Sequence, residues 1–222
     1  IASFSVSSSN CSVFSSTVRV SFVSLLSLST ILSVSFAAFS SESSLGRISP
    51  VNKAKLLAEL TEERFIRKTN KGGNEIYSFN AFNSPNLMKE VGRLRELTFR
   101  TAGGGTGKEV DIDPFDVDEQ VPYQQLIVWD PKEQEILGGY RYILCDNLPL
   151  NQEGEPNLAT TELFRFSKAF KKQYLTKMIE LGRSFVQPLY QSTKMGRKSL
   201  FALDNLWDGL GALTVENPGM EY

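Results

Sequence analysis

Residues 123–144, YQQLIVWDPKEQEILGGYRYIL, decide the fold of this chain. Two runs rich in β-branched and aromatic residues, Tyr123–Trp129 and Glu135–Leu144, flank the sequence Asp130-Pro131-Lys132-Glu133. Asp and Pro favour a turn, whereas Val, Ile, Tyr and Trp suit a pleated sheet. The stretch therefore predicts a β-hairpin of two antiparallel strands.

Helices and further strands are expected on either side of this hairpin. The periodicity of apolar residues predicts helices over 52–67, 85–102, 161–174 and 197–213. The second of these helices begins at Ser84-Pro85 and has a buried stripe formed by Leu87, Val91, Leu94 and Thr98. Further strands are expected over 75–82 and 178–186. This order predicts an α+β fold with a mixed, mostly antiparallel sheet flanked by helices.

Residues 1–44 differ from the rest of the chain. They hold 18 serines and two charged residues, Arg19 and Glu42. A signal peptide, a membrane anchor diluted by serine, a disordered segment and a mispredicted start all fit this low-complexity segment. We therefore expect the folded domain to comprise residues 45–222.

The composition of the 222 residues excludes several classes of chemistry. There is no histidine, so Ser-His-Asp and Cys-His catalysis and histidine-ligated metals are excluded. Cys11 and Cys145 lack metal-ligand spacing, so no metal site is expected. The net charge of -1 does not favour a nucleic-acid partner. The glycine run 103–107 lacks the P-loop spacing, and it predicts a helix C-cap followed by a flexible loop.

Two groups of charged residues are candidates for a site. Asp111, Asp113 and Asp116 form either a solvated acidic loop or a cluster that binds or deprotonates a cationic group. Glu180 and Arg183 lie in the apolar strand 178–186, where an unpaired charge is costly. Strand alternation predicts that these two side chains lie on opposite faces. Glu180 is either part of a structural ion pair or a site carboxylate.

Basic residues gather between positions 160 and 200, where nine Lys or Arg residues face two Glu residues. A solvated surface is the common explanation of such a bias. It also suits an acidic protein partner or a phosphate-bearing carrier.

Four motifs in order resemble the pattern of acyl-homoserine-lactone synthases. They are Arg95-Glu96-Leu97-Thr98-Phe99, Asp111-x-Asp113-x-x-Asp116, Gly138-Gly139-Tyr140-Arg141 and Glu180-x-x-Arg183. The surrounding segments look closer to the ornithine-lipid and glycine-lipid N-acyltransferases, often labelled hemolysin-like, with the glycine-lipid form of Bacteroidetes the nearest match. Those segments are Gly92-Arg93-Leu94-Arg95, residues 179–186 and Leu206-Trp207-Asp208-Gly209-Leu210.

The resemblance implies a GNAT fold whose C-terminal part is missing from this chain. It implies transfer of a 3-hydroxyacyl group from acyl carrier protein to the amino group of glycine or ornithine, in bacterial aminolipid synthesis. The acyl thioester of the carrier, or of coenzyme A, is then a substrate, and no cofactor is needed. The location implied is cytoplasmic, and a peripheral contact with the inner face of the membrane is left open.

The resemblance also assigns roles to individual residues. Catalytic roles are implied for Glu180, Asp111, Asp113 and Arg183, and substrate binding for Arg95, Phe99, Asp116 and Arg141. Residues expected to bind the acyl carrier protein are Lys171, Lys172, Lys194, Arg197 and Lys198. In this mechanism Glu180, or the Asp111/Asp113 pair through water, takes the proton of the attacking amine. Two alternatives remain, an acyl-homoserine-lactone synthase and a non-catalytic module that binds acyl carrier protein.

Overall fold

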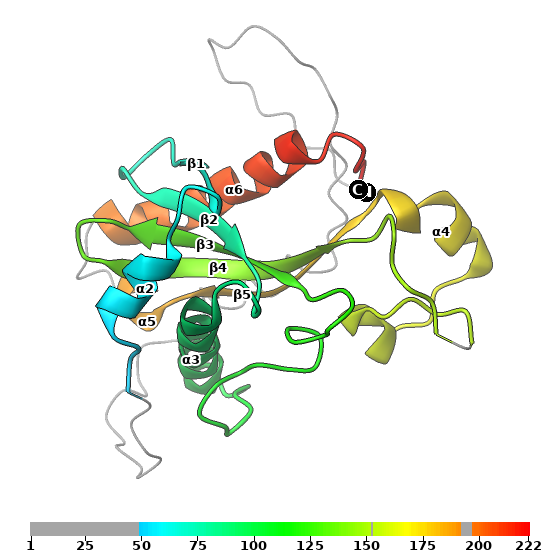
Figure 1. The fold of residues 1–222 in the computed structure, drawn as a ribbon, viewed down its shortest axis with the longest axis horizontal. Coiled ribbons are helices and arrows are strands. Elements are labelled where there is room, and N and C mark those ends of the chain that lie inside the picture. Colours follow the sequence, from blue (N-terminus) through cyan, green and yellow to red (C-terminus); the bar gives the residue numbers. More distant parts are fainter. Residues whose placement is uncertain (1–48, 152, 192–196) are drawn as a thin grey trace, which may run out of the picture.

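The strands form one antiparallel sheet in the order β1-β2-β3-β4-β5 (Figure 1). This computed structural model describes residues 49–151, 153–191 and 197–222. The strand bounds are β1 Phe65–Lys68, β2 Glu75–Phe79, β3 Gln124–Asp130, β4 Glu135–Leu144 and β5 Ile179–Val186. The predicted hairpin is confirmed as β3 and β4, which pair from Gln124↔Tyr142 to Asp130↔Glu135.

Helices cover both faces of this sheet (Figure 1). Their bounds are α2 Lys53–Glu59, α3 Pro85–Thr101, α4 Lys168–Gln173, α5 Pro188–Gln191 and α6 Arg197–Glu216, with short 3-10 turns η1 Ala159–Glu162 and η2 Leu175–Lys177. The predicted stripe of α3 is confirmed, since Leu87, Val91, Leu94 and Thr98 are all buried. Helices α2 and α3 pack on one face, whereas α6 packs on the other.

Alternation along the strands separates two apolar cores. Tyr77 and Phe79 of β2 face α3, whereas Ile76, just before them in the chain, faces the α6 side. The two glycines of β4 allow close approach of its neighbours. A Cβ atom at Gly138 would overlap the carbonyl oxygen of Phe185, and one at Gly139 would overlap that of Leu126. Together these contacts fix the register of β4 between β3 and β5.

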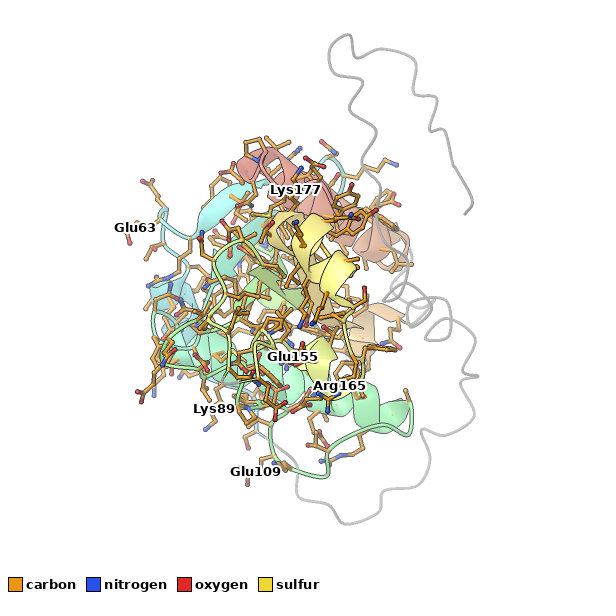
Figure 2. The ribbon with its side chains drawn as sticks, turned by 90° about the vertical axis from the view of Figure 1, so that its right-hand side faces the viewer. Glu63, Lys89, Glu109, Glu155, Arg165 and Lys177 are labelled. Atoms are coloured by element: carbon orange, nitrogen blue, oxygen red, sulfur yellow. The ribbon has the colours of Figure 1, made fainter. Side chains whose placement is uncertain are left out.

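The connection from β4 to β5, residues 145–178, carries a third apolar cluster at one end of the sheet. Tyr123, Ile143, Cys145, Leu158 and Leu175 are its buried members. Figure 2 looks onto this connection, on which Glu155, Arg165 and Lys177 are labelled. The cluster anchors the connection beside the first residues of β3.

Two predicted helices are wrong in extent. The helix expected over 52–67 ends at Glu59, and Phe65–Lys68 is instead a strand paired with β2. Pairing with a sheet edge overrides the helical periodicity there. The helix expected over 161–174 is divided into η1 and α4, with the five residues 163–167 between them. Residues 1–44 lie outside the described residues, and within the described part no helix is long and apolar enough to cross a membrane.

Candidate active site

The acidic loop crosses helix α3 at Gly92. The Asp111 N–H donates to the Gly92 carbonyl oxygen at 2.9 Å. A Cβ atom at Gly92 would lie 2.7 Å from Cγ1 of Ile112, so a larger residue would push the loop away from the helix. This close crossing brings Asp111 beside Arg95, one helical turn farther along α3.

The glycine-rich loop is held by a buried carboxylate. Helix α3 ends as predicted at a glycine with positive φ, Gly103 at +82°. Beyond it, Glu96 accepts hydrogen bonds from the Thr106 N–H at 2.8 Å, the Thr106 hydroxyl at 2.7 Å and the Gly107 N–H at 2.9 Å. Burial alone would raise the pKa of Glu96, but its bonds to Thr106, Arg100 and Gly107 lower that pKa to about 2. The loop expected to be flexible is thus tied to α3.

Arg95 of α3 lies at the centre of the acidic cluster and is fully buried. Its Nη2 atom lies 2.9 Å from Oδ2 of Asp116, and its Nε atom lies 3.3 Å from Oδ2 of Asp111. Gln125 of β3 completes the arrangement by donating to Asp116 at 2.9 Å. Buried charges need such partners to offset the loss of hydration.

Arg141 of β4 joins the cluster from the sheet. Its Nη1 atom lies 2.7 Å from both carboxylate oxygens of Asp113 and 3.4 Å from Asp116. Burial would raise the pKa of Asp113, but the charge of Arg141 and then that of Arg183 hold this pKa below its usual value. Asp113 is therefore a poor proton acceptor in this arrangement, although it was a predicted catalytic residue.

The prediction that Arg183 faces away from Glu180 is wrong. Arg183 has a positive φ of 51°, and the register between β4 and β5 shifts between Gly139 and Arg141. This β-bulge breaks the alternation of side chains along β5. As a result, Arg183 Nη2 lies 3.2 Å from Asp113 and Nε lies 3.4 Å from Asp111. Its side chain is 36% exposed, the most open of the three arginines in the cluster.

Glu180 lies apart from the ion pairs but on the same face of the sheet. Its Oε1 accepts a hydrogen bond from the Tyr123 hydroxyl at 2.7 Å, and its Oε2 accepts one from the Thr160 hydroxyl at 2.7 Å. The guanidinium of Arg141 lies 4.8 Å from the centre of the Tyr123 ring. Tyr123 thereby lies between the charged cluster and Glu180.

The structure brings together Glu180, Arg183, Arg95, Arg141 and the three aspartates. Phe99 does not join them, because it packs against the apolar core beneath α3. Sequence reasoning missed the site neighbours Tyr123, Thr160 and Gln125, which read as ordinary strand and loop residues. Within the described residues, no group of acidic or cysteine side chains is arranged to hold a metal ion.

The predicted carrier-binding lysines are less uniform. Lys171 forms an ion pair with Glu155 at 2.8 Å, so its charge is already matched within the fold. Lys172 is exposed on α4. Lys194 lies outside the described residues, and Arg197 and Lys198 begin α6 with side chains beyond the described part. A cavity of about 270 Å³ lies in the same region, lined by Cys145, Leu148, Leu150, Pro156 and Leu175 among others.

Comparison with known proteins finds one matching family model and two similar curated proteins. Residues 94–199 match the family model described as an acetyltransferase (GNAT) domain. Two curated relatives are each named glycine N(alpha)-acyltransferase. The one from Phocaeicola vulgatus is 58% identical over 175 residues, covering 79% of this chain and 53% of the relative. The one from Bacteroides thetaiotaomicron is 59% identical over 175 residues, covering 79% of this chain and 52% of the relative.

The chain thus spans about half the length of these two relatives. No solved structure was found to match it. The family match runs from α3 through β5 into the start of α6, which is the segment that carries the charged cluster and Glu180. Residues 94–199 are therefore similar to a GNAT acetyltransferase domain, and the antiparallel sheet flanked by helices agrees with that match.

Proposed function

We propose that the protein transfers a fatty acyl group from a thioester to the α-amino group of glycine. One observation carries this proposal. Glu180, the one site carboxylate without an arginine partner among the described residues, shares a face of the sheet with the ion-paired cluster. The names of the two relatives support both the acyl transfer and the choice of glycine.

The chemistry fits a chain that has no histidine. The neutral amine attacks the thioester carbonyl, a C–N bond forms, and the C–S bond breaks as the thiolate leaves. The amine proton passes to Glu180, which later returns it to the departing thiolate, so protons and charge balance. No protein nucleophile is needed, and catalysis rests on positioning and electrostatic stabilisation. Backbone N–H groups on the outer edge of β5 would stabilise the oxyanion.

The ion-paired residues take supporting roles in this proposal. Arg95, Asp116 and Arg141 are almost completely buried, and they hold the acidic loop against the sheet. Arg183 is open enough to meet the carboxylate of the amino acid acceptor, since 36% of its side chain is exposed.

We assign the donor as an acyl group on acyl carrier protein. Arg165, Lys168 and Lys172 are exposed in the β4–β5 connection and make no ion pair among the described residues, so they can attract an acidic carrier. The apolar lining of the nearby cavity offers room for part of an acyl chain. The expected role of Lys171 is weakened, because Glu155 already pairs with it.

The experiment is an acyl-transfer assay on the protein expressed from its complete reading frame. A 3-hydroxyacyl thioester is supplied on acyl carrier protein or on coenzyme A, with glycine, ornithine or no amine, and products are identified by mass spectrometry. We expect N-acylglycine from the carrier-bound donor at the highest rate. N-acylornithine as main product would overturn the acceptor. A diffusible lactone in extracts of expressing cells, or carrier binding without transfer, would overturn the function.

A further inference from the structure

Both carboxylate oxygens of Glu180 are engaged by hydroxyl groups from distant parts of the chain. Tyr123, just before β3, donates to Oε1, and Thr160, in η1 of the β4–β5 connection, donates to Oε2, each at 2.7 Å. Tyr123 is 1% exposed, whereas Thr160 and Glu180 are partly open. The two donors fix the plane of the carboxylate, because each oxygen is held separately.

The direction of the tyrosine hydroxyl is itself fixed. The Ala159 N–H donates to the Tyr123 oxygen at 2.9 Å, so the hydroxyl proton points to Glu180. Burial, followed by the negative charge of Glu180, raises the pKa of Tyr123 far above its usual value. Tyr123 therefore remains a donor at every pH at which the protein would be assayed.

We propose that Tyr123 and Thr160 are positioning residues that hold Glu180 ready to accept the proton of the attacking amine. This inference rests on the proposed acyl transfer. Each carboxylate oxygen has two lone pairs, and one lone pair on each is used by its hydroxyl donor. The remaining lone pairs receive the amine proton, while neither Tyr123 nor Thr160 transfers a proton itself.

The same contacts link the site to the β4–β5 connection. Ala159 and Thr160 are adjacent in the chain, and they bond to Tyr123 and Glu180 respectively. Leu158, just before them, is buried in the apolar cluster with Tyr123. The connection is thus held to Glu180 by the Thr160 hydrogen bond, and to Tyr123 by the Ala159 hydrogen bond and the packing of Leu158.

The test uses four variants of the complete protein in the acyl-transfer assay. Thr160→Val keeps the shape of the side chain without its hydroxyl, and Thr160→Ser keeps the hydroxyl. Tyr123→Phe removes the other donor. Thr161→Val is the matched control, because the Thr161 hydroxyl bonds to the Leu158 carbonyl oxygen at 2.6 Å and does not contact Glu180.

We expect Thr160→Val and Tyr123→Phe each to lower kcat by about tenfold or more, the effect of losing a hydrogen bond to a charged group. KM for both substrates should change by less than about threefold, since the lost bonds act on the proton acceptor rather than on substrate binding. Thr160→Ser should keep most of the activity. Thr161→Val should match the wild type.

The pH profile gives a readout that a merely structural role would not move. Removing a donor disfavours the charged form of the carboxylate, so the acidic limb of kcat/KM should move to higher pH in both donor variants. Tyr123 bonds to Glu180, and Cys145 lies close enough for the charge of Glu180 to act on it. Arg141, which pairs with Asp113, lies against the ring of Tyr123. Burial, followed by the charge of Glu180, raises the pKa of Cys145 to about 12, and Asp113 and Arg141 stay ionised as a pair.

The outcomes separate this inference from the proposed function. A wild-type protein that forms no N-acyl product would remove the function, and the inference with it. An active wild type with unchanged kcat and pH profile in Thr160→Val and Tyr123→Phe would overturn the inference alone. So would a Thr161→Val variant that loses as much activity as Thr160→Val, since the loop and not the hydroxyl would then be responsible.

Discussion

Arg141 Nη1 is bonded to both carboxylate oxygens of Asp113, at 2.7 Å each. A carboxylate held in this way stays ionised, because accepting a proton would weaken its ion pair with the arginine. Glu180, in contrast, is held by two neutral hydroxyls. The two acidic residues therefore differ in what they can do, although the sequence presents both as candidates for the same proton transfer.

Glu180→Gln should lower kcat for acyl transfer by about 10²–10⁴, the usual contribution of a general base. The amide cannot accept the amine proton, while its size keeps the contacts with Tyr123 and Thr160 largely intact. Steady-state kinetics with the carrier-bound donor and glycine measure the effect. Glu162→Gln, an exposed neighbour in η1, is the control and should keep full activity. A Glu180→Gln enzyme with wild-type turnover would remove Glu180 from this role.

Asp116→Asn should destabilise the fold by about 3–5 kcal/mol, the cost of breaking a buried ion pair. Asp116 is fully buried and binds both Arg95 and Arg141, so the amide would leave two buried guanidinium groups short of a charge. Urea unfolding measures the change. Glu109→Gln, in the same loop but projecting from the surface in Figure 2, should change the free energy of unfolding by less than about 0.5 kcal/mol. Equal stability of the two variants would contradict this account of the cluster.

Stability should fall between about pH 4.5 and pH 2 because of Glu96. The folded protein lowers the pKa of this carboxyl from 4.5 to about 2. A lowered pKa gives stability that is complete above the unfolded value and is lost as the pH falls through the folded value. In Glu96→Gln this part of the pH dependence should disappear. Glu63→Gln, an exposed side chain in Figure 2, should retain the wild-type curve. If stability depended on pH in the same way in wild type and Glu96→Gln, the proposed role of the Glu96 hydrogen bonds would be contradicted.

Gly138→Ala should destabilise the sheet by about 1–3 kcal/mol, the range for overpacking. Its Cβ atom would overlap the carbonyl oxygen of Phe185, and backbone cannot move aside without disturbing the pairing of β4 with β5. Gly211→Ala in α6 is the matched control, because nothing lies within 4 Å of its Cβ position. That change should stabilise the protein by about 0.5–1 kcal/mol, since Ala favours helix. Thermal unfolding of both variants gives the comparison.

Sequence patterns predicted the elements whose periodicity is local. The hairpin 123–144 and the apolar stripe of α3 followed from alternation and from helical spacing, and both are confirmed. The motif residues Arg95, Asp111, Asp113, Asp116, Arg141, Glu180 and Arg183 were all identified from the chain alone. The end of α2 was not, because the strand at Phe65–Lys68 depends on the presence of β2 as its partner.

Which of these charges pair, and which stays available, was decided by the tertiary structure. The bulge at Arg183 places this side chain on the face opposite to the one that alternation predicts, and no local sequence pattern indicates the bulge. Tyr123 lies 57 positions from Glu180 in the chain, and Thr160 lies 20 positions from it. Their hydrogen bonds to Glu180 therefore require the folded sheet and its β4–β5 connection. The sequence by itself determined the β3–β4 hairpin, the apolar stripe of α3 and the charged residues, because these depend on near neighbours. The fold decided their roles, because burial and pairing depend on residues brought together from far along the chain.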